Sequence, residues 1–236
     1  MKFINVFCFV FIICFSSALA DKRNMVWTYQ YSILNPGEAE LEQYSTFSSS
    51  EKAKFGSATN AELNLELEFG MSKFMDFAVY QVFTQSHTGG FSYDGLKLRW
   101  RFRLAEQDSF WVNPIFYIEY EADPTFQKSA FEPKFIFQKD FGKFSISLNP
   151  YMEIEKKGAE KWDAEFKYAA GAFYRFTKLM SLGLELAGDP GANYIGPTIS
   201  HGTDKMWVSF GSQFGIGKIA IEDPKFRLRM IIGVNL

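Results

Sequence analysis

Apolar and polar residues alternate along most of the chain with a period of two. From Ala61 to Phe69 every odd position is apolar, and the even positions between them are three glutamates and one asparagine. From Leu96 to Leu104 the even positions are apolar and the odd positions are all lysine or arginine. Successive side chains of a strand point to opposite faces, so each stretch predicts a strand with one apolar and one charged face.

The same alternation recurs over the remainder of the chain, in the stretches 110–121, 131–138, 144–155, 165–176, 181–186, 206–216 and 225–236. No amphipathic helical pattern of useful length interrupts them. After the first 20 residues there is also no run of about 18 apolar residues, so a transmembrane helix is not expected. The pattern therefore predicts an all-β protein.

Two all-β architectures fit such strands. In a soluble sandwich the apolar face points inward, whereas in a membrane barrel it meets lipid and the polar face lines the lumen. The segments here are longer than the five or six residues, roughly, of a typical soluble strand. Their apolar faces also stay aromatic toward the ends, as in the aromatic girdles of membrane barrels, at Trp100, Trp111, Tyr120, Tyr168 and Tyr174. These features favour an antiparallel, up-and-down transmembrane β-barrel.

The links between segments alternate in length, as periplasmic turns and extracellular loops do. Short links are expected at 70–73, 105–109, 139–143, 177–178 and 200–205, and longer ones at 48–59, 85–94, 121–129, 156–163 and 217–223. The link at 188–191 is short where a long one is due. Counting back from the C-terminus gives about twelve strands, the first at 38–47, with ten or fourteen as alternatives. Residues 21–37, with the apolar stretch Val26–Leu34, then form a periplasmic arm or one folded into the lumen, and 38–236 form the barrel.

The first 20 residues have the features of a cleaved signal peptide. Lys2 is followed by an apolar run, and Ala18-Leu19-Ala20 is a small-residue cleavage site. Both cysteines, Cys8 and Cys14, lie in this segment, and no small residue precedes Cys14 as lipoprotein processing would require. Its removal leaves 216 residues without cysteine, which excludes a disulfide scaffold and a thiol or cysteine–zinc site.

The charge balance excludes a strongly basic nucleic-acid-binding protein. The whole chain carries 25 basic and 27 acidic residues, for a net charge of −2. Loss of Lys2 with the signal peptide leaves 24 basic against 27 acidic residues, a net charge of −3. No nucleic-acid partner is expected.

Three stretches carry a resemblance to a known family: Ala18-Leu19-Ala20, the strand-turn Glu66–Lys73 and the final segment Leu228–Leu236. Together they resemble Gram-negative outer-membrane β-barrels, in particular small barrels described as transporters or porins. The resemblance implies an outer-membrane location among outer-membrane lipid. It also implies recognition by the barrel-assembly machinery of alternate apolar residues in the last strand, here Leu228, Met230, Ile232, Val234 and Leu236. Leu236 departs from the family, which usually ends in phenylalanine or another aromatic residue.

The chain contains two histidines, His87 and His201, so few catalytic arrangements need to be considered. Barrel phospholipases and lipid A deacylases resemble one another in a His-x-Ser motif, but His87 is followed by Thr88-Gly89-Gly90 and lies in an expected loop. His201 follows Ser200 in an expected short turn, and adjacent strand residues point to opposite faces. No catalytic residue is therefore predicted, and a lipid-modifying hydrolase remains the least favoured alternative.

Two further features suggest a ligand only weakly. The acidic residues Glu119, Glu121 and Asp123 are compatible with a loop cation or an omptin-like protease, but no Asp–His couple accompanies them. The glycine-rich stretch Gly211–Gly217 lacks the following helix of a phosphate loop, so it reads as a strand with small lumen-facing residues. No cofactor and no metal site is predicted.

The polar face itself is the candidate functional surface. Basic residues on 97–103 oppose acidic residues on 62–68, and Arg227 and Arg229 are expected to reach Glu38, Glu40 and Glu42 across the barrel closure. Opposed charges either pair and close a narrow lumen or form a constriction that selects small polar solutes, and the second interpretation is slightly favoured. The expected lumen-lining residues are Glu62, Glu66, Glu68, Lys97, Arg99, Arg101, Arg103, Glu119, Glu121, Lys134, Glu153, Lys167, Arg175, Glu185, Arg227 and Arg229.

Overall fold

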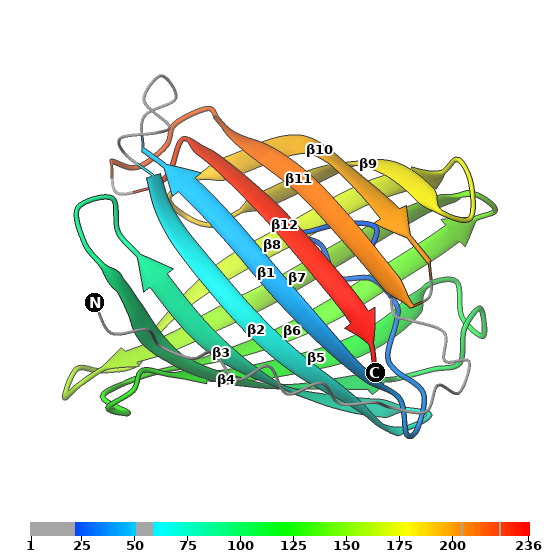
Figure 1. Cartoon of the computed structure of the whole chain (residues 1–236), viewed down its shortest axis with the longest axis horizontal. Coiled ribbons are helices and arrows are strands. Elements are labelled where there is room, and N and C mark those ends of the chain that lie inside the picture. The colour runs from blue at the N-terminus through cyan, green and yellow to red at the C-terminus, as the bar shows by residue number, and fades with distance from the viewer. Residues whose placement is uncertain (1–21, 51–58, 204, 222) are drawn as a thin grey trace, which may run out of the picture.

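The structure, a computed structural model, describes residues 22–50, 59–203, 205–221 and 223–236. It is a closed barrel of twelve antiparallel strands in which each strand pairs with its neighbours in sequence and β12 pairs with β1 (Figure 1). The strands are β1 (Ala39–Ser49), β2 (Thr59–Ser72), β3 (Met75–Gln85), β4 (Phe91–Arg103), β5 (Asn113–Ala122), β6 (Lys128–Phe141), β7 (Phe144–Lys157), β8 (Asp163–Arg175), β9 (Met180–Gly188), β10 (Asn193–Gly202), β11 (Met206–Ile216) and β12 (Phe226–Asn235). Within the described ranges no helix has the length and apolarity that crossing a membrane requires.

The two faces of each strand separate as the alternation predicts. On β9, Leu182, Leu184 and Leu186 are exposed on the outside, whereas Ser181 and Glu185 are buried in the lumen. Twelve strands of 9 to 14 residues close the sheet, so no unpaired strand edge remains. The predicted antiparallel up-and-down barrel of about twelve strands is confirmed.

The barrel has two unlike ends. One end, here called the loop end, carries the links 86–90, 123–127, 158–162 and 189–192, and β1 and β11 end there while β2 and β12 begin. The other, the turn end, carries the links 73–74, 104–112, 142–143 and 176–179 together with the end of β10, the start of β11 and the C-terminus. The expected short link at 105–109 and the expected strand start at 110 are both wrong. Phe110 and Trp111 are 63% and 82% exposed in a longer link, because the Asn113 side chain accepts the Asp108 N–H at 2.6 Å and holds the chain in a turn before β5 begins.

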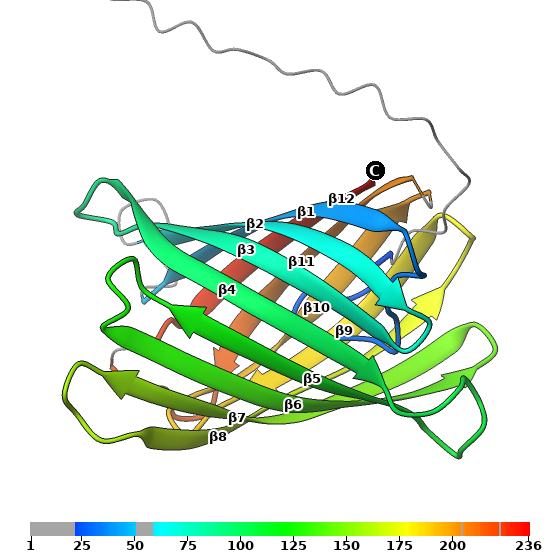
Figure 2. The same ribbon diagram turned by 90° about the horizontal axis from the view of Figure 1, so that it is seen from below.

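Residues 22–38, here called the arm, lie inside the barrel. Figure 2 shows the blue segment within the ring of strands, and Met25, Val26, Thr28 and Leu34 are each 1% exposed or less. Both ends of the arm lie at the turn end, because Lys22 Nζ donates to Leu179 O at 2.7 Å and Gly37 N–H donates to Gly70 O at 3.0 Å. The arm is therefore a loop inserted into the lumen from the turn end, and Val26–Leu34 is not a spanning strand.

Candidate functional site

Two carboxylates on the barrel wall accept backbone N–H groups of the arm, and Asp76 on β3 takes that of Leu34 at 3.3 Å. Glu185 on β9 is fully buried and accepts three consecutive backbone N–H groups, those of Val26 at 2.8 Å, Trp27 at 2.9 Å and Thr28 at 2.7 Å. Hydrogen bonds to an ionised acceptor are roughly twice as strong as neutral ones. Glu185 is thus the main polar attachment of the arm to the wall.

Side chains of other strands supply further acceptors along the arm. Asn149 on β7 accepts the Tyr29 N–H at 2.6 Å, and Gln138 on β6 accepts the Tyr31 N–H at 2.8 Å. A buried backbone N–H needs a partner, which a neighbouring strand usually provides. Here lumen-facing side chains take that role, so the arm is seated without joining the sheet.

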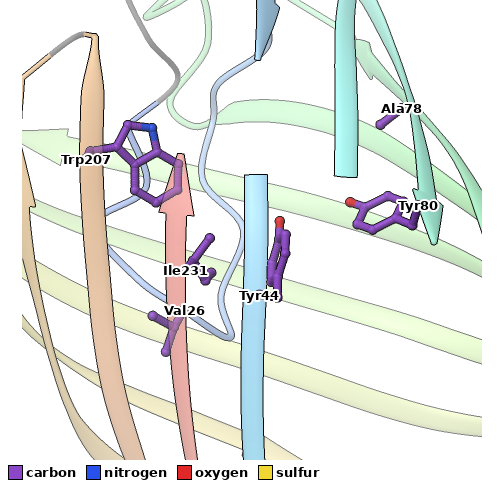
Figure 3. Close-up of a cluster of buried hydrophobic side chains, with 6 residues drawn as sticks. All are labelled: Val26, Tyr44, Ala78, Tyr80, Trp207 and Ile231. Carbon is purple, nitrogen blue, oxygen red and sulfur yellow. The ribbon is translucent and has the colours of Figure 1, made fainter. Parts of the chain in front are cut away.

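Close packing completes the seat. Val26 belongs to a buried cluster with wall residues of β1, β3, β11 and β12, including Trp207 and Ile231 (Figure 3). A Cβ atom at Gly211 would lie 2.6 Å from Val26 Cγ2 and 2.9 Å from the Trp27 ring. A Cβ atom at Gly171 would lie 2.3 Å from Met25 Sδ. Glycine at these two wall positions leaves the space that the arm occupies.

Two polar cavities flank the arm inside the lumen. The loop-end cavity has a volume of about 210 Å³, and the turn-end cavity has a volume of about 270 Å³. Trp27 and Tyr29 border the first, whereas Asn24, Gln30 and Tyr31 border the second, and no residue lines both. The arm therefore borders both cavities, through different residues.

The acidic residues of β2 and the basic residues of β4 meet across β3. Arg99 Nη1 lies 3.0 Å from Glu66 Oε1, and Arg99 Nη2 lies 2.7 Å from Glu68 Oε2. Arg101 contacts Glu68 and forms a pair of hydrogen bonds to Asp76 at 3.0 Å. Ala78 of β3 stands between Glu68 and Arg99 in the register, and its small side chain lets the two longer ones meet over it. These charges form a fully buried ion-pair network on one wall.

Most of the other expected lumen residues of opposite charge are also brought together. Lys97 lies 2.7 Å from Glu121 and 3.5 Å from Glu119. Lys134 lies 2.7 Å from Glu132 and also 4.4 to 4.6 Å from the ring centres of three tyrosines. Further toward the loop end, Lys167 contacts Glu153. The strands β4 to β6 thus present paired charges to the loop-end cavity.

A few expected lumen residues stand apart. Arg103 and Arg175 lie near the turn end and donate to the backbone carbonyls of Lys73 and Gly142. Glu62 accepts a hydrogen bond from Asn64 at 2.9 Å. These residues are not joined to the ion-pair network of β2 and β4.

The expected contact of Arg227 and Arg229 with Glu38, Glu40 and Glu42 is wrong. The register places the two arginines opposite Ser48 and Thr46, three rungs or more from the glutamates of β1. Arg229 Nε instead donates to Thr46 Oγ1 at 2.9 Å, and Arg227 donates twice to Gln213 Oε1, at 3.0 and 2.7 Å.

Some buried lumen residues were not foreseen, and Glu40 has a partner other than the expected one. Asp76 joins the ion-pair network, and Glu40 accepts a hydrogen bond from the Trp207 indole N–H at 2.5 Å. Arg23 of the arm donates to Tyr44 Oη at 2.7 Å. The sequence could have indicated that Asp76 faces the lumen, because it lies on the same face of β3 as the buried Ala78 and Tyr80. This was missed because β3 carries apolar residues on both faces.

Comparison with known proteins supports the architecture. No protein-family model matches the sequence, and no curated protein matches it either. Among solved structures, the COG4313 outer membrane channel from Pseudomonas putida F1 has a TM-score of 0.62 at 15% identity over 90% of this chain and 100% of that one. The KdgM porin in complex with disordered oligogalacturonate has a TM-score of 0.62 at 9% identity, over 84% of this chain and 99% of that one. The NanC porin has a TM-score of 0.59 at 9% identity, over 83% of this chain and 98% of that one. The chain has the outer-membrane β-barrel fold.

In this outer-membrane-type barrel the two histidines have different surroundings. His87 is exposed in a loop-end link, where its ring lies 3.3 Å from Asn60 Oδ1. His201 lies within β10 and not in a turn, because the strand continues to Gly202, and its side chain faces outward. Ser200 points into the lumen and lies within 3.3 Å of Asn24 Oδ1. The pair Ser200 and His201 therefore lies on opposite faces of the barrel wall, as the alternation predicts.

The acidic residues near the loop end each have their own partners. Glu119 accepts from Tyr117 Oη at 2.6 Å, and Glu121 pairs with Lys97. Asp123 accepts hydrogen bonds from Thr125 Oγ1 and the Lys128 N–H, and these bonds hold the pKa of its carboxyl below the usual value. Among the described residues no three acidic, histidine or cysteine side chains are grouped to hold a metal ion.

Proposed function

We propose that this chain is an outer-membrane channel for small polar solutes and that the arm closes the lumen between passages. The observation that carries the proposal is the pair of polar cavities, one toward each end of the barrel, that both border the arm. Longer loops face the outside of the cell and short turns face the periplasm in such barrels, so the loop end is extracellular. The likeness to outer-membrane channels and porins supports the same function.

A closed structural or surface-interaction barrel is the second candidate. It is favoured by the buried network of Arg99 and Arg101 with Glu66 and Glu68, because paired charges fill part of the lumen. That network lies on one wall, however, and the cavities lie beside it. A hydrolase embedded in the barrel has no supporting cluster of side chains at His87 or His201.

The outward face of β12 fits the expected role in assembly. Leu228, Met230, Ile232 and Val234 alternate with lumen-facing residues along the strand. We include in the proposal that the assembly machinery recognises this face, and that residues 1–20 are removed during export.

A reversible lock of the arm tests the proposed function. Gly211 and Val26 lie close enough for a disulfide, because a Cβ atom at Gly211 would lie 2.6 Å from Val26 Cγ2, which is itself bonded to Val26 Cβ. The two Cβ atoms are therefore no farther apart than the roughly 3.5–4.5 Å that a disulfide spans. Without residues 1–20, the double variant Val26→Cys with Gly211→Cys would carry no other cysteine.

Planar-bilayer recording gives the readout. The unmodified protein is expected to conduct, the oxidised double variant to lose conductance, and the reduced double variant to regain it. Each single cysteine variant is the control and should respond to neither oxidant nor reductant. Absence of conductance in the unmodified protein would overturn the channel proposal, and equal conductance in the oxidised and reduced forms would overturn the role of the arm.

A further inference from the structure

Two arginines of β12 differ from the other basic residues of the lumen. Arg227 and Arg229 both line the loop-end cavity. In the described part of the chain, no carboxylate lies within ion-pair distance of either one, whereas Lys97, Arg99 and Lys134 each have such a partner. Their hydrogen bonds go to neutral oxygens, those of Gln213, Thr46 and the Val26 carbonyl. Glu62, which lines the same cavity, lies one strand beyond Thr46 in the register and faces Arg229 without direct contact. Two guanidinium groups therefore face one nearby carboxylate on this side of the cavity, which leaves an excess of positive charge.

The arm brings the two guanidinium groups to one aromatic ring. Their central carbons lie 5.7 Å and 5.6 Å from the centre of the Trp27 ring, and Arg227 also stacks at 3.7 Å on Tyr194. Aromatic faces attract cations, but they do not neutralise them. Two like charges on one ring repel each other, and an anion between them would remove that repulsion.

Unused hydrogen-bond donors lie in the same place. Trp27 Nε1 and Gln213 Nε2 are buried and have no hydrogen-bond partner among the described residues. Trp27 itself lines the cavity, and Gln213 binds Arg227 through its other side-chain atom. Buried donors without a partner are uncommon in proteins and indicate an acceptor that completes the site.

We propose that Arg227, Arg229 and Trp27 form the binding site for the carboxylate of a small organic anion that enters the cavity from the loop end. A guanidinium group binds a planar carboxylate through two parallel hydrogen bonds, and the indole N–H adds a third donor. The inference rests on the proposed channel function and names the class of solute that the channel recognises.

The remainder of the cavity limits the body of the anion. Its volume of about 210 Å³ has room for a small organic molecule. Tyr44, Tyr80, Tyr117 and Tyr151 contribute rings and phenol oxygens to the lining. Such side chains suit a body that has both apolar and hydroxyl-bearing surface.

Isothermal titration of the folded full-length barrel in detergent tests the site with a matched pair of probes. Glucuronate and glucose differ in having a carboxylate or a hydroxymethyl group at one carbon. Glucuronate is expected to bind at least tenfold more tightly than glucose, and its binding should weaken as ionic strength rises. Equal binding of the two sugars, or no binding of glucuronate, would overturn the proposal. Inorganic phosphate separates carboxylate recognition from general anion binding, because phosphate binding as tight as that of glucuronate would contradict the assignment.

Variants locate the site on β12. The double variant Arg227→Gln with Arg229→Gln should lose at least tenfold in glucuronate affinity. Lys225→Gln removes one positive charge, as each of the two arginine substitutions does, but at an exposed position in the adjacent link, and should leave the affinity unchanged. Retained binding in a double variant that still shows the heat-dependent gel mobility of a folded barrel would place the site elsewhere and overturn the inference.

The binding measurement is independent of conduction. If the unmodified protein conducts but does not bind glucuronate, the anion site is wrong and the channel function stands. If it binds glucuronate at Arg227 and Arg229 but does not conduct, the site stands and the channel proposal is wrong.

Discussion

Replacement of Glu185 by glutamine should release the arm from the wall without disturbing the barrel. The substitution keeps the shape of the side chain but removes its charge. Oε2 accepts the N–H groups of Trp27 and Thr28, and Oε1 accepts that of Val26. In Glu185→Gln one of these oxygens becomes an NH₂ group, so at least one backbone N–H faces another donor.

The expected loss follows from these three bonds. A buried N–H without a partner costs about 1–3 kcal/mol, and each remaining bond loses about 1 kcal/mol when its acceptor becomes neutral. Docking of the arm should therefore weaken by about 3 kcal/mol or more, which raises the undocked population roughly 100-fold, since each 1.4 kcal/mol is a factor of ten.

Amide hydrogen exchange measures that population directly. Exchange at residues 26–28 should accelerate by about the same factor in the variant, because these amides exchange only when the arm leaves its seat. Single-channel recordings should show more frequent or longer openings. Glu153→Gln is the matched control, since Glu153 also faces the lumen but pairs with Lys167, and it should leave arm exchange unchanged. Exchange in Glu185→Gln within threefold of the unmodified protein would refute the assigned role of Glu185.

Other substitutions separate the arm, the ion-pair network and the histidines. Gly211→Val places side-chain atoms where Val26 and Trp27 lie and should displace the arm, raising conductance while the heat-dependent gel mobility stays that of a folded barrel; unchanged conductance would contradict this. Arg101→Met removes one of the two arginines that pair with the buried carboxylates of Glu68 and Asp76 and should destabilise the barrel by about 3 kcal/mol in urea unfolding. Arg175→Met at the turn end is its control, with an expected change of about 1 kcal/mol or less, and similar losses in both would count against the network. Joint replacement of His87 and His201 by alanine should leave conductance unchanged, and its loss would restore a role for one of them.

The fold was predictable because the alternation has a single physical meaning in a barrel. On β2 and β4 the charged residues occupy every second position, so one face must be kept from lipid and the other from water. Charges at the membrane midplane cost about 2–4 kcal/mol each, which fixes the orientation of these strands without knowledge of their neighbours. The link at 104–112 was mispredicted because Phe110 and Val112 continue the outward apolar phase of β5. Apolar side chains at a membrane rim face lipid whether or not they belong to a strand.

The candidate site was only partly predictable. The lumen-facing positions follow from strand phase alone, but the contacts between them depend on register, which the sequence did not specify across β1 and β12. The expected contact of Arg227 with Glu38 failed for this reason. The arm was harder still, since Trp27, Tyr29 and Tyr31 alternate as a strand would. What keeps them out of the sheet is the acceptors of Glu185, Asn149 and Gln138, which lie more than 100 residues away in sequence.

The distribution of charge inside the barrel favours a channel over a sealed structural plug. A lumen that served only to close the barrel would gain most from pairing every charge, because an unpaired buried charge is costly. Arg99 and Arg101 follow that rule in the network of β2, β3 and β4. Arg227 and Arg229 do not, although they face a cavity bordered by the arm. Two arginines share one nearby carboxylate, Glu62, where an entering solute would first meet the arm, and this excess of positive charge is expected for recognition of a solute and not for stability.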